Sequence, residues 1–452
     1  MNTSTQRPAG MFAFTIIWIG QIVSLLGTAM SEFGLTLWAY QVTGKATPLA
    51  LVGFFFIIPQ VALAPFIGVL VDHSNRKLMM MLSDLAAALT TALVLGLYLT
   101  GNLQIWHLYV AATITGLFQG FQWPAYSASI SLMLPKEQYA RANGMLSMAE
   151  NASAVFAPIL AGALFGPLGL AAILVIDLAC AAFAIGALVF VHIPQPSVSE
   201  SGREAGSKVI EQVTYGLRYI LKRPSLLGLQ TVFMIGNFFF SIAFAVIAPM
   251  ILARTSNNEL VYGSVQSAGA IGGVIGALVM SAWGGPKRRV HGVLLGWAFS
   301  GLFGVTLLGL GRSPFIWSVA MFLGMLASPF INGSNQAIWQ SKVAPDVQGR
   351  VFTTRMMIAW LVMPLAQLLA GPLSDQVLEP AMSASGGLTD VFGWLVGVGP
   401  GSGIALIFVF CGLIIVFIGL GGYLFPAVRD AEDLLPDHAE IAQADQSSVA
   451  LI

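Results

Sequence analysis

Four acidic residues lie inside long apolar stretches of this sequence, where a charged side chain is costly. They are Glu32, Asp84, Glu150 and Asp177. A charge at the centre of a bilayer costs about 3 kcal/mol or more unless it is paired, solvated or neutralised. Burial favours the neutral form of a carboxyl group, which suits a side chain that takes up and releases protons. These acids are therefore candidate proton-coupling groups. The alternative is that each is a structural acid, hydrogen-bonded between helices.

Two other stretches carry matching polar and aromatic residues on what would be one face of a helix. The spacing i, i+3, i+4, i+7 joins Gln119, Gln122, Trp123 and Tyr126 in one stretch and Asn332, Asn335, Gln336 and Trp339 in the other. Such faces need water, a ligand or another helix to satisfy their amides. Aromatic rings beside amides suit a bulky, partly apolar ligand, so both stripes are candidate substrate-cavity residues, with Asn237 as a weaker addition. Hydrogen bonding between helices is the alternative.

A short charged segment separates two apolar stretches in the first fifth of the chain. It spans 68–77 and contains Gly68, Asp72, Arg76 and Lys77. The apolar stretches on either side are each long enough to cross a hydrocarbon core of about 30 Å. The segment is therefore expected on one membrane face. There Asp72 would make a specific contact, and the two basic residues would bind lipid phosphates or neighbouring acids.

The composition explains why these polar residues stand out. Of the 452 residues, 57% are hydrophobic and only 9% are charged, whereas soluble proteins have about 25% charged residues. The mean hydropathy is +0.82. Apolar stretches of about 20 residues recur along nearly the whole chain, without the alternation of a membrane β-barrel. The sequence thus predicts an all-α polytopic membrane protein. Its formal net charge of zero gives no sign of a nucleic-acid partner.

We expect twelve transmembrane helices in two pseudo-symmetric six-helix bundles. Their approximate ranges are 11–40, 48–71, 78–100, 104–134, 142–166, 168–192, 225–253, 260–283, 291–311, 313–341, 351–374 and 403–426. A Ser/Gly/Glu-rich segment at 197–207 and a Gly-rich loop at 374–402 interrupt the succession of spans. Apolar residues from 209 to 221 recur at helical spacing among charged ones, which is typical of an amphipathic helix on a membrane surface.

These features predict four parts of the chain: an N-terminal bundle (1–192), a cytoplasmic linker with the amphipathic helix (193–224), a C-terminal bundle (225–427) and an acidic tail (428–452). We expect the tail to be mobile after Arg429. Lysine and arginine residues number 17 on the side of the N-terminus and 3 on the other side. Because such residues gather on the cytoplasmic side, we predict cytoplasmic termini and a location in the inner, or cytoplasmic, membrane.

The two predicted halves share sequence features. Pro-Lys-Glu-Gln-Tyr-Ala-Arg at 135–141 precedes the fifth span, and Pro-Asp-Val-Gln-Gly-Arg at 345–350 precedes the eleventh. Repeated halves with a site near the membrane midplane are a common transporter architecture. The basic residues 287–289 follow the eighth span as a counterpart of the charged segment after the second. Gly284 stands where an acid would be, however, so only the N-terminal half is expected to carry the acidic contact.

Twelve spans, a central linker and Gly-x-x-x-Asp-His-x-x-Arg-Lys after the second span together resemble the major facilitator superfamily. Ala-Pro-x-x-Ala-Gly at 157–162 is similar to the Gly-Pro-x-x-Gly-Gly signature of its antiporters. The stretch 24–44, the Gly349-Arg350-Val-Phe sequence and the Gly-rich loop before the last span look like the macrolide-efflux and enterobactin-exporter branch. Gly116 occupies the place of an arginine that is usual in the fourth span of many proton-coupled members.

The resemblance implies an exporter of amphipathic small molecules that works by alternating access and proton antiport, with no cofactor beyond the proton gradient. It places the first, fourth, seventh and tenth spans around the substrate cavity, which assigns both polar stripes to that cavity. It also favours Glu32 or Glu150 as the coupling group. The charged segment would lie beside the start of span eleven. Asp72 would there meet the positive end of a helix near Gly349 and Arg350, as a conformational latch.

Two alternatives of the same fold stay open: a lipid or lysolipid flippase, and a nutrient uptake facilitator. The expected partners are a small amphipathic substrate, protons and membrane lipid, and we expect a monomer. The five histidines lack metal-ligand spacing, and the glycine-rich 397–403 lacks the Lys-Ser/Thr of a phosphate loop. Without a Ser/His/Asp constellation either, the sequence predicts neither a metal site nor an enzyme. Arg355 is expected to reach the membrane surface along its aliphatic stem.

Overall fold

The structure is a computed structural model that describes residues 10–73, 75–134, 139–191, 193, 209–343, 345–383 and 386–434. Every regular element in these ranges is a helix. Ten helical stretches are long and apolar enough to cross a membrane. The prediction of an all-α polytopic membrane protein is therefore confirmed.

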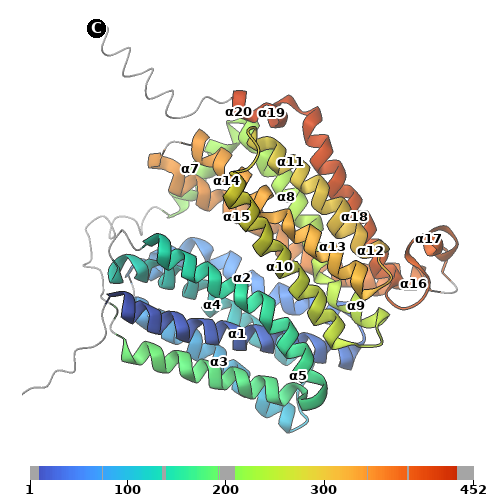
Figure 1. The fold of residues 1–452 in the computed structure, drawn as a ribbon, viewed down its shortest axis with the longest axis horizontal. Helices are drawn as coiled ribbons and strands as arrows, with labels where there is room; N and C mark the ends of the chain where they lie inside the picture. The colour runs from blue at the N-terminus through green and yellow to red at the C-terminus, as the bar shows by residue number, and fades with distance from the viewer. Residues whose placement is uncertain are drawn as a thin grey trace, which may run out of the picture. The chain divides into compact units, whose positions relative to one another are not determined.

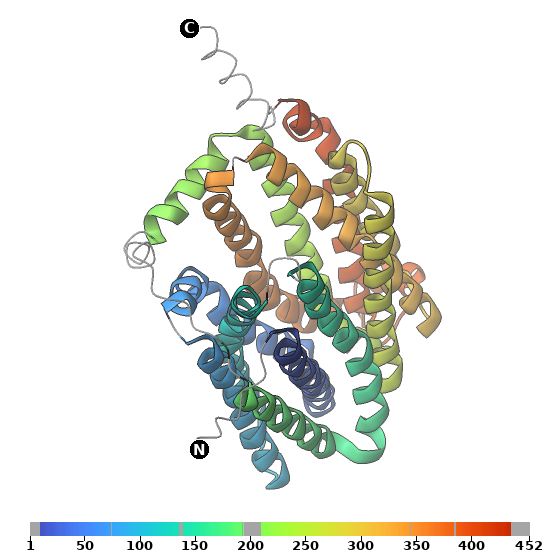
Figure 2. The ribbon, with the colours of Figure 1, turned by 60° about the vertical axis from the view of Figure 1, so that its left-hand side comes forward.

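The ten stretches differ from the twelve expected spans in two places. Spans five and six fall within one element, α5 (Tyr139–Phe190), which changes direction at Gly169 (φ 72°, ψ 177°). Figure 2 shows this reversal, with the two arms of α5 joined by a sharp bend. The fourth span coincides with α4 (Ile105–Met133), which is not among the ten stretches found within the described residues. The count of twelve thus stays a prediction.

The contacts within the chain divide it into two compact units, and unit 1 comprises Met1–Val209 and Thr255–Ser267. Its helices are α1 (Gly10–Thr43), α2 (Ala46–His73), α3 (Arg76–Leu99), α4, α5 and the first part of α10 (Glu259–Trp283). Helices α1 to α5 of this unit are drawn from blue to green in Figure 1.

Glycines let the helices of unit 1 approach closely. A Cβ atom at Gly27 of α1 would lie 2.8 Å from the Cβ of Cys180 in α5. A Cβ at Gly116 of α4 would fall on the carbonyl oxygen of Phe56 in α2. The α2–α4 packing therefore requires glycine at this position, because any side chain would collide with the backbone. This contact gives a packing reason for glycine at the position where the family resemblance led us to look for an arginine.

The start of α10 packs against α1 and α5 within unit 1. Phe33 stacks on Tyr262 with 4.7 Å between ring centroids. Gln41 Nε2 donates to Glu259 Oε1 at 2.8 Å, and Ser267 Oγ donates to a backbone oxygen of α5 at 2.5 Å. Residues far apart in the sequence thus belong to the same compact unit.

Unit 2 comprises Ile210–Arg254 and Ala268–Ile452. Several of its helices are interrupted where the sequence predicted single spans. The elements are α7 (Val209–Leu221), α8 (Pro224–Ala245), α9 (Ile247–Arg254), the remainder of α10, α11 (Arg289–Phe299), η2 (Ser300–Thr306), α12 (Leu307–Leu310), α13 (Pro314–Leu326), α14 (Ser328–Lys342), α15 (Pro345–Pro372), η3 (Leu373–Leu378), α16 (Glu379–Ala381), α17 (Thr389–Val396), α18 (Ser402–Gly421), η4 (Gly422–Leu424), α19 (Pro426–Arg429) and α20 (Ala431–Leu434).

Helix α7 occupies the segment in which the sequence predicts an amphipathic helix. Its Ile220 is buried in a cluster with Leu226, Trp339 and Val343, whereas its Arg218 is exposed. One face of α7 is thereby fixed to the core of unit 2, as the apolar periodicity requires.

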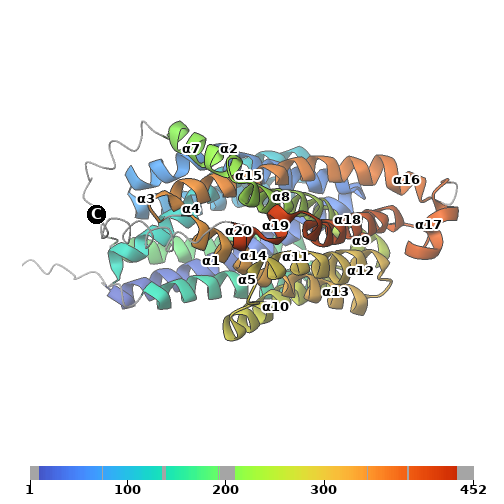
Figure 3. The ribbon, with the colours of Figure 1, turned by 90° about the horizontal axis from the view of Figure 1, so that it is seen from above.

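The segment expected as an irregular Gly-rich loop, 374–402, is more regular than its composition suggests. It contains most of η3, α16 and α17, which lie at one end of unit 2 in Figure 3. The Glu379 carboxylate accepts from the backbone N–H groups of Gly401 at 3.2 Å and Ile404 at 2.9 Å. An acid at this place satisfies unpaired donors at the start of α18 and complements the helix dipole.

The first residues of the acidic tail are also folded, which corrects the expectation of a mobile segment directly after Arg429. Helix α20 contacts the N-terminus of α11, where Glu432 Oε2 accepts from the N–H of Val290 at 2.9 Å. Arg288 forms salt bridges with Asp430 at 3.9 Å and with Asp433. Arg288, one of the basic residues 287–289, thus has acidic partners that come from the tail. Residues 435–452 lie outside the described residues.

Candidate functional site

A buried carboxylate in unit 1 joins three helices. Asp84 of α3, which is 3% exposed, accepts from Gln21 Nε2 of α1 at 2.9 Å through Oδ2 and from Gln122 Nε2 of α4 at 2.8 Å through Oδ1. Gln122 Nε2 also donates to Gln21 Oε1 at 2.9 Å, so the three side chains form a closed ring. Ser24 Oγ adds a longer bond of 3.5 Å to Oδ1. Both carboxylate oxygens act as acceptors, which is the pattern of the ionised form.

Local sequence explains how this ring is positioned. Helix α3 starts at Arg76 because Asn75 caps it, accepting from the N–H of Leu78 at 3.1 Å. Asp84 then follows two turns later on the face that is directed at α1 and α4. Neighbouring Ser83 donates to the carbonyl oxygen of Phe118 at 3.0 Å and to Gln122 Oε1 at 3.2 Å. The amide of Gln122 is consequently held at both of its ends.

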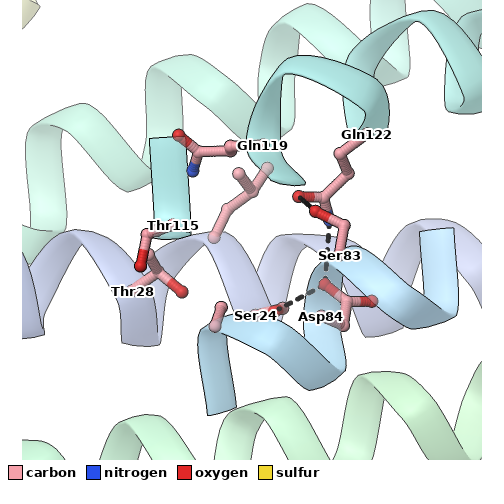
Figure 4. Close-up of a pocket in the computed structure, with 9 residues that line it drawn as sticks. Ser24, Thr28, Ser83, Asp84, Thr115, Gln119 and Gln122 are labelled. Carbon is pink, nitrogen blue, oxygen red and sulfur yellow. Dashed lines mark hydrogen bonds between the residues drawn. The ribbon is translucent and has the colours of Figure 1, made fainter. Parts of the chain in front are cut away.

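The ring borders a small pocket that lies entirely within unit 1. Its polar lining is visible in Figure 4, where the side chains of α1, α3 and α4 converge. The lining consists of Ser24, Leu25, Thr28, Ser83, Asp84, Ala87, Thr115, Gln119 and Gln122. Such a pocket has room for about one water molecule and enough polar groups to bind it.

A second buried carboxylate lies in the arm of α5 that follows the bend at Gly169. Asp177 is 4% exposed and accepts from Thr28 Oγ1 at 3.3 Å through Oδ1 and from Thr91 Oγ1 at 2.9 Å through Oδ2. The donors recorded for Asp177, like those for Asp84, are neutral groups. Among the side chains that the structure describes, neither carboxylate has the cationic partner that usually accompanies a buried charge.

The two acids favoured by the sequence are placed differently. Glu32 lies in α1, and its side chain is exposed in the structure. Within the described part of the chain its carboxylate has no hydrogen bond or ion pair. Glu150 lies in α5, but its side chain is outside the described residues. The acids with a defined hydrogen-bonded environment are thus Asp84 and Asp177.

The first predicted stripe is only partly directed at the pocket. Gln119 and Gln122 line it, whereas Tyr126 is 4% exposed and stacks on Phe14 in the core of unit 1. Trp123 is outside the described residues. Asn237 of α8 belongs to unit 2 and is half-buried there. One helix face thus divides between a pocket and a core.

The second predicted stripe, in α14, makes mostly internal contacts. Asn335 is 1% exposed, and its Oδ1 accepts from Trp339 Nε1 at 3.1 Å. Trp339 itself is fully buried. Exposed Asn332 donates to the backbone oxygen and hydroxyl of Ser328 at 3.0 and 3.1 Å. Hydrogen bonds within one helix therefore satisfy much of this stripe.

Gln336 holds the side chain of Arg355. Arg355 of α15 donates to Gln336 Oε1 at 3.0 Å, and its guanidinium lies 5.2 Å from the ring centroid of Trp339. Gln230 Nε2 of α8 donates to the Arg355 carbonyl oxygen at 3.1 Å. Arg355 was expected to extend to the membrane surface. In the structure its guanidinium instead contacts an amide and an aromatic ring inside unit 2.

The predicted latch is described in part. Arg76 is 9% exposed. Lys77 Nζ donates to the carbonyl oxygens of Val189 and Val191 at 3.1 and 2.7 Å. A cation there complements the C-terminal end of α5. The surroundings of the other four latch residues lie outside what the structure describes; these residues are Gly68, Asp72, Gly349 and Arg350.

Sequence reasoning missed the hydroxyl and amide partners of the two acids. Gln21, Ser24 and Thr28 fall at i, i+3 and i+7 on α1, which is the signal that could have identified a polar face. Thr91 gave no such signal, because its partner comes from a distant part of the chain. No group of three potential metal ligands occurs among the residues that the structure describes.

Comparisons with known proteins identify the family of this chain. The sequence pattern of the Major Facilitator Superfamily matches residues 17–365. Macrolide efflux protein A of Streptococcus pyogenes is 27% identical over 373 residues, which cover 80% of this chain and 90% of the relative. The multidrug efflux pump Tap of Mycolicibacterium fortuitum is 25% identical over 361 residues, which cover 77% and 87%.

A solved structure shows that the fold is shared as well. The crystal structure of a bacterial homologue of the human lysosomal transporter Spinster, inward-facing and unoccupied, matches with a TM-score of 0.66. Its sequence identity is 13%, over 91% of this chain and 96% of that one. Since the family pattern covers most of the sequence as well, the chain belongs to the major facilitator superfamily.

Proposed function

We propose that this protein is a secondary active exporter of small amphipathic molecules, macrolides among them, driven by protons that move inward. The names of the relatives, which include macrolide efflux and multidrug efflux, support export and this class of substrate. One observation carries the proposal of proton coupling. It is the Asp84 carboxylate, buried among neutral donors and bordering a polar pocket.

The ring around Asp84 suggests how a proton could change the conformation. When the carboxylate is ionised, it accepts from Gln21 and Gln122 at the same time and ties α1 and α4 to α3. Protonation turns one oxygen into a donor, which then faces the N–H of an amide. A buried donor left without an acceptor costs about 1–3 kcal/mol, so the ring must rearrange. Loading one proton would thus loosen the contact among three helices.

Substrate contact is proposed for two amides of α4 that border the pocket and for a half-buried amide of unit 2. Gln119 and Gln122 are the candidates in α4, and Asn237 is the candidate in α8. Asn335 and Trp339 would instead support the end of α14, because both are fully buried and bonded to each other. Amides beside apolar surface suit a bulky ligand with few charges.

The proposal keeps the predicted organisation of the chain: two six-helix bundles, cytoplasmic termini and a monomer in the cytoplasmic membrane. It also keeps Asp72 as a latch toward residues 349–350. The bonds from Lys77 to the end of α5 would hold the latch segment in place on its own unit. The Asp72→Asn variant should then slow transport and leave substrate binding nearly intact.

The test is transport by purified protein in proteoliposomes with an imposed pH gradient, using a panel of dyes, macrolides, siderophores and lysolipids. Wild-type protein should move at least one amphipathic compound against its gradient, and Asp84→Asn should lose the dependence on pH. Movement of lysolipid alone would favour a flippase. Downhill movement that ignores the pH gradient would favour a facilitator. If folded protein moves none of the compounds, the proposal is wrong.

A further inference from the structure

We infer that Thr28 connects the second buried acid, Asp177, to the pocket beside Asp84, so that a proton can pass between the pocket and Asp177. The inference rests on the proposed proton coupling and deepens it. It assigns a positioning and relay role to a hydroxyl that no charge or motif distinguishes in the sequence.

The geometry of Thr28 is the first observation. Its side chain lines the pocket together with Ser24 and Asp84, as Figure 4 shows. The same hydroxyl donates to Asp177 Oδ1 at 3.3 Å. Ser24, one turn earlier on α1, donates to Asp84 Oδ1 at 3.5 Å. Two successive turns of one helix thus contact two different buried acids.

A comparison with Thr91 shows what is particular about Thr28. Both hydroxyls donate to Asp177, and the bond from Thr91 is the shorter one, at 2.9 Å against 3.3 Å. Only Thr28 is among the residues that line the described pocket. As a structural donor Thr91 should therefore matter at least as much as Thr28. As a link to the pocket, Thr28 should matter alone.

Of the two hydroxyls recorded as donors to Asp177 within the described residues, Thr28 is the one that also lines the pocket. Asp177 is 4% exposed. Neutral hydroxyl groups do not cancel the charge of an anionic Asp177. A proton is the partner that removes the buried charge, and it must come from a hydrated space.

The transfer step conserves protons and charge. A proton from pocket water binds the lone pair of Thr28 Oγ1, while the existing Thr28 O–H proton moves to Asp177 Oδ1. One O–H bond breaks at the donor water and one at Thr28, and one forms at Thr28 and one at the carboxylate. The net result is one proton moved from the pocket to Asp177, with no oxidant, reductant or other reactant.

Three variants separate this role from a structural one. Thr28→Val removes the hydroxyl and keeps the shape, Thr28→Ser restores a hydroxyl, and Thr91→Val removes the other donor to Asp177. Each is reconstituted with the wild-type protein as reference, and radiolabelled erythromycin is the probe. Two rates are measured: uptake driven by a pH gradient, and erythromycin exchange at equilibrium, which needs no net proton transfer.

We expect Thr28→Val to lose about tenfold or more of the gradient-driven rate, because a proton-transfer group is missing. Its exchange rate should stay within roughly threefold of wild type, since substrate binding is intact. Thr28→Ser and Thr91→Val should keep both rates within roughly threefold. Equal losses in Thr28→Val and Thr91→Val, or a normal gradient-driven rate in Thr28→Val, would overturn the inference alone. Wild-type protein that does not respond to the gradient overturns the proposed function and this inference together.

Discussion

The closed ring around Asp84 makes a prediction about stability that needs no knowledge of the substrate. Replacing Asp84 with asparagine keeps the shape but converts one acceptor oxygen into an N–H donor. Both oxygens of Asp84 face amide N–H groups, from Gln21 and from Gln122. Donor therefore meets donor at one of them. In the wild-type protein Gln122 Nε2 donates to Gln21 Oε1. Turning the Gln21 amide by 180° relieves the conflict with the asparagine but places the Gln21 N–H group against the Gln122 N–H group.

Turning the second amide does not remove the conflict either. Gln122 Oε1 accepts from Ser83, and after a turn this oxygen would face the oxygen of the new asparagine. One buried polar group thus stays unsatisfied in each arrangement, at about 1–3 kcal/mol. Asp84→Asn also removes a buried charge, which acts in the opposite direction.

Asp177→Asn is the matched control, because it removes a buried charge in the same unit. Its partners are the hydroxyls of Thr28 and Thr91, and a hydroxyl can rotate to accept as readily as it donates. The new amide therefore finds partners without conflict. The free energy of unfolding should be lower for Asp84→Asn than for Asp177→Asn by about 1–3 kcal/mol.

The assay is equilibrium unfolding in mixed micelles at neutral pH, followed by the fluorescence of the ten tryptophans. Wild-type protein and both variants are compared under the same lipid and detergent conditions. A difference between the two variants below about 0.5 kcal/mol would refute the reasoning. It would mean that the ring can rearrange freely, or that Asp84 already carries a proton in the folded protein.

Three further predictions follow from contacts outside the ring. Gly116→Ala should destabilise the protein by about 1–3 kcal/mol in the same unfolding assay, because its methyl group meets the backbone of α2; Gly96→Ala, with open space around it, is the control and should not. Lys77→Met should lower the free energy of unfolding by about 0.5–2 kcal/mol through loss of two bonds to the end of α5; a change below this range would mean that water replaces the ammonium group. Hydrogen bonding from Arg429 holds the pKa of Asp430 below its usual range, so the stabilisation that this pair gives should be complete above about pH 4, the ordinary value, and disappear only as the pH falls through the lowered pKa. The carbon-13 NMR shift of the Asp430 carboxyl carbon, measured against pH, checks this, and a titration midpoint at or above pH 4 would contradict it.

The sequence was sufficient for the fold class and the membrane location of most helices. Long apolar stretches can be satisfied only as helices in a bilayer, whatever their neighbours are. The amphipathic helix at 209–221 was equally readable, because its periodicity is a local property. The interruptions in unit 2 were not predicted, although Pro249 beside the break at Val246, between α8 and α9, is a local signal for one of them.

The sequence identified the acids of the candidate site but not their hydrogen-bond partners. Composition alone identified Asp84 and Asp177 as unusual, since any acid in an apolar span is costly. The resemblance favoured Glu32 or Glu150 as the coupling group. Glu32 is exposed, the side chain of Glu150 lies outside the described residues, and Asp84 has defined partners. Which acid is enclosed depends on where helices from distant parts of the chain meet, and hydropathy carries no information about that.

The sequence by itself thus determined a helical membrane protein with a few buried acids and amides. The tertiary structure decided that Gln21, Asp84 and Gln122 close a ring and that Thr28 lies between two carboxylates. The physical reason is the range of the interactions. Burial in a bilayer acts on each residue separately, whereas a hydrogen bond needs two atoms within about 3 Å. Only the packing of α1, α3, α4 and α5 brings those atoms together.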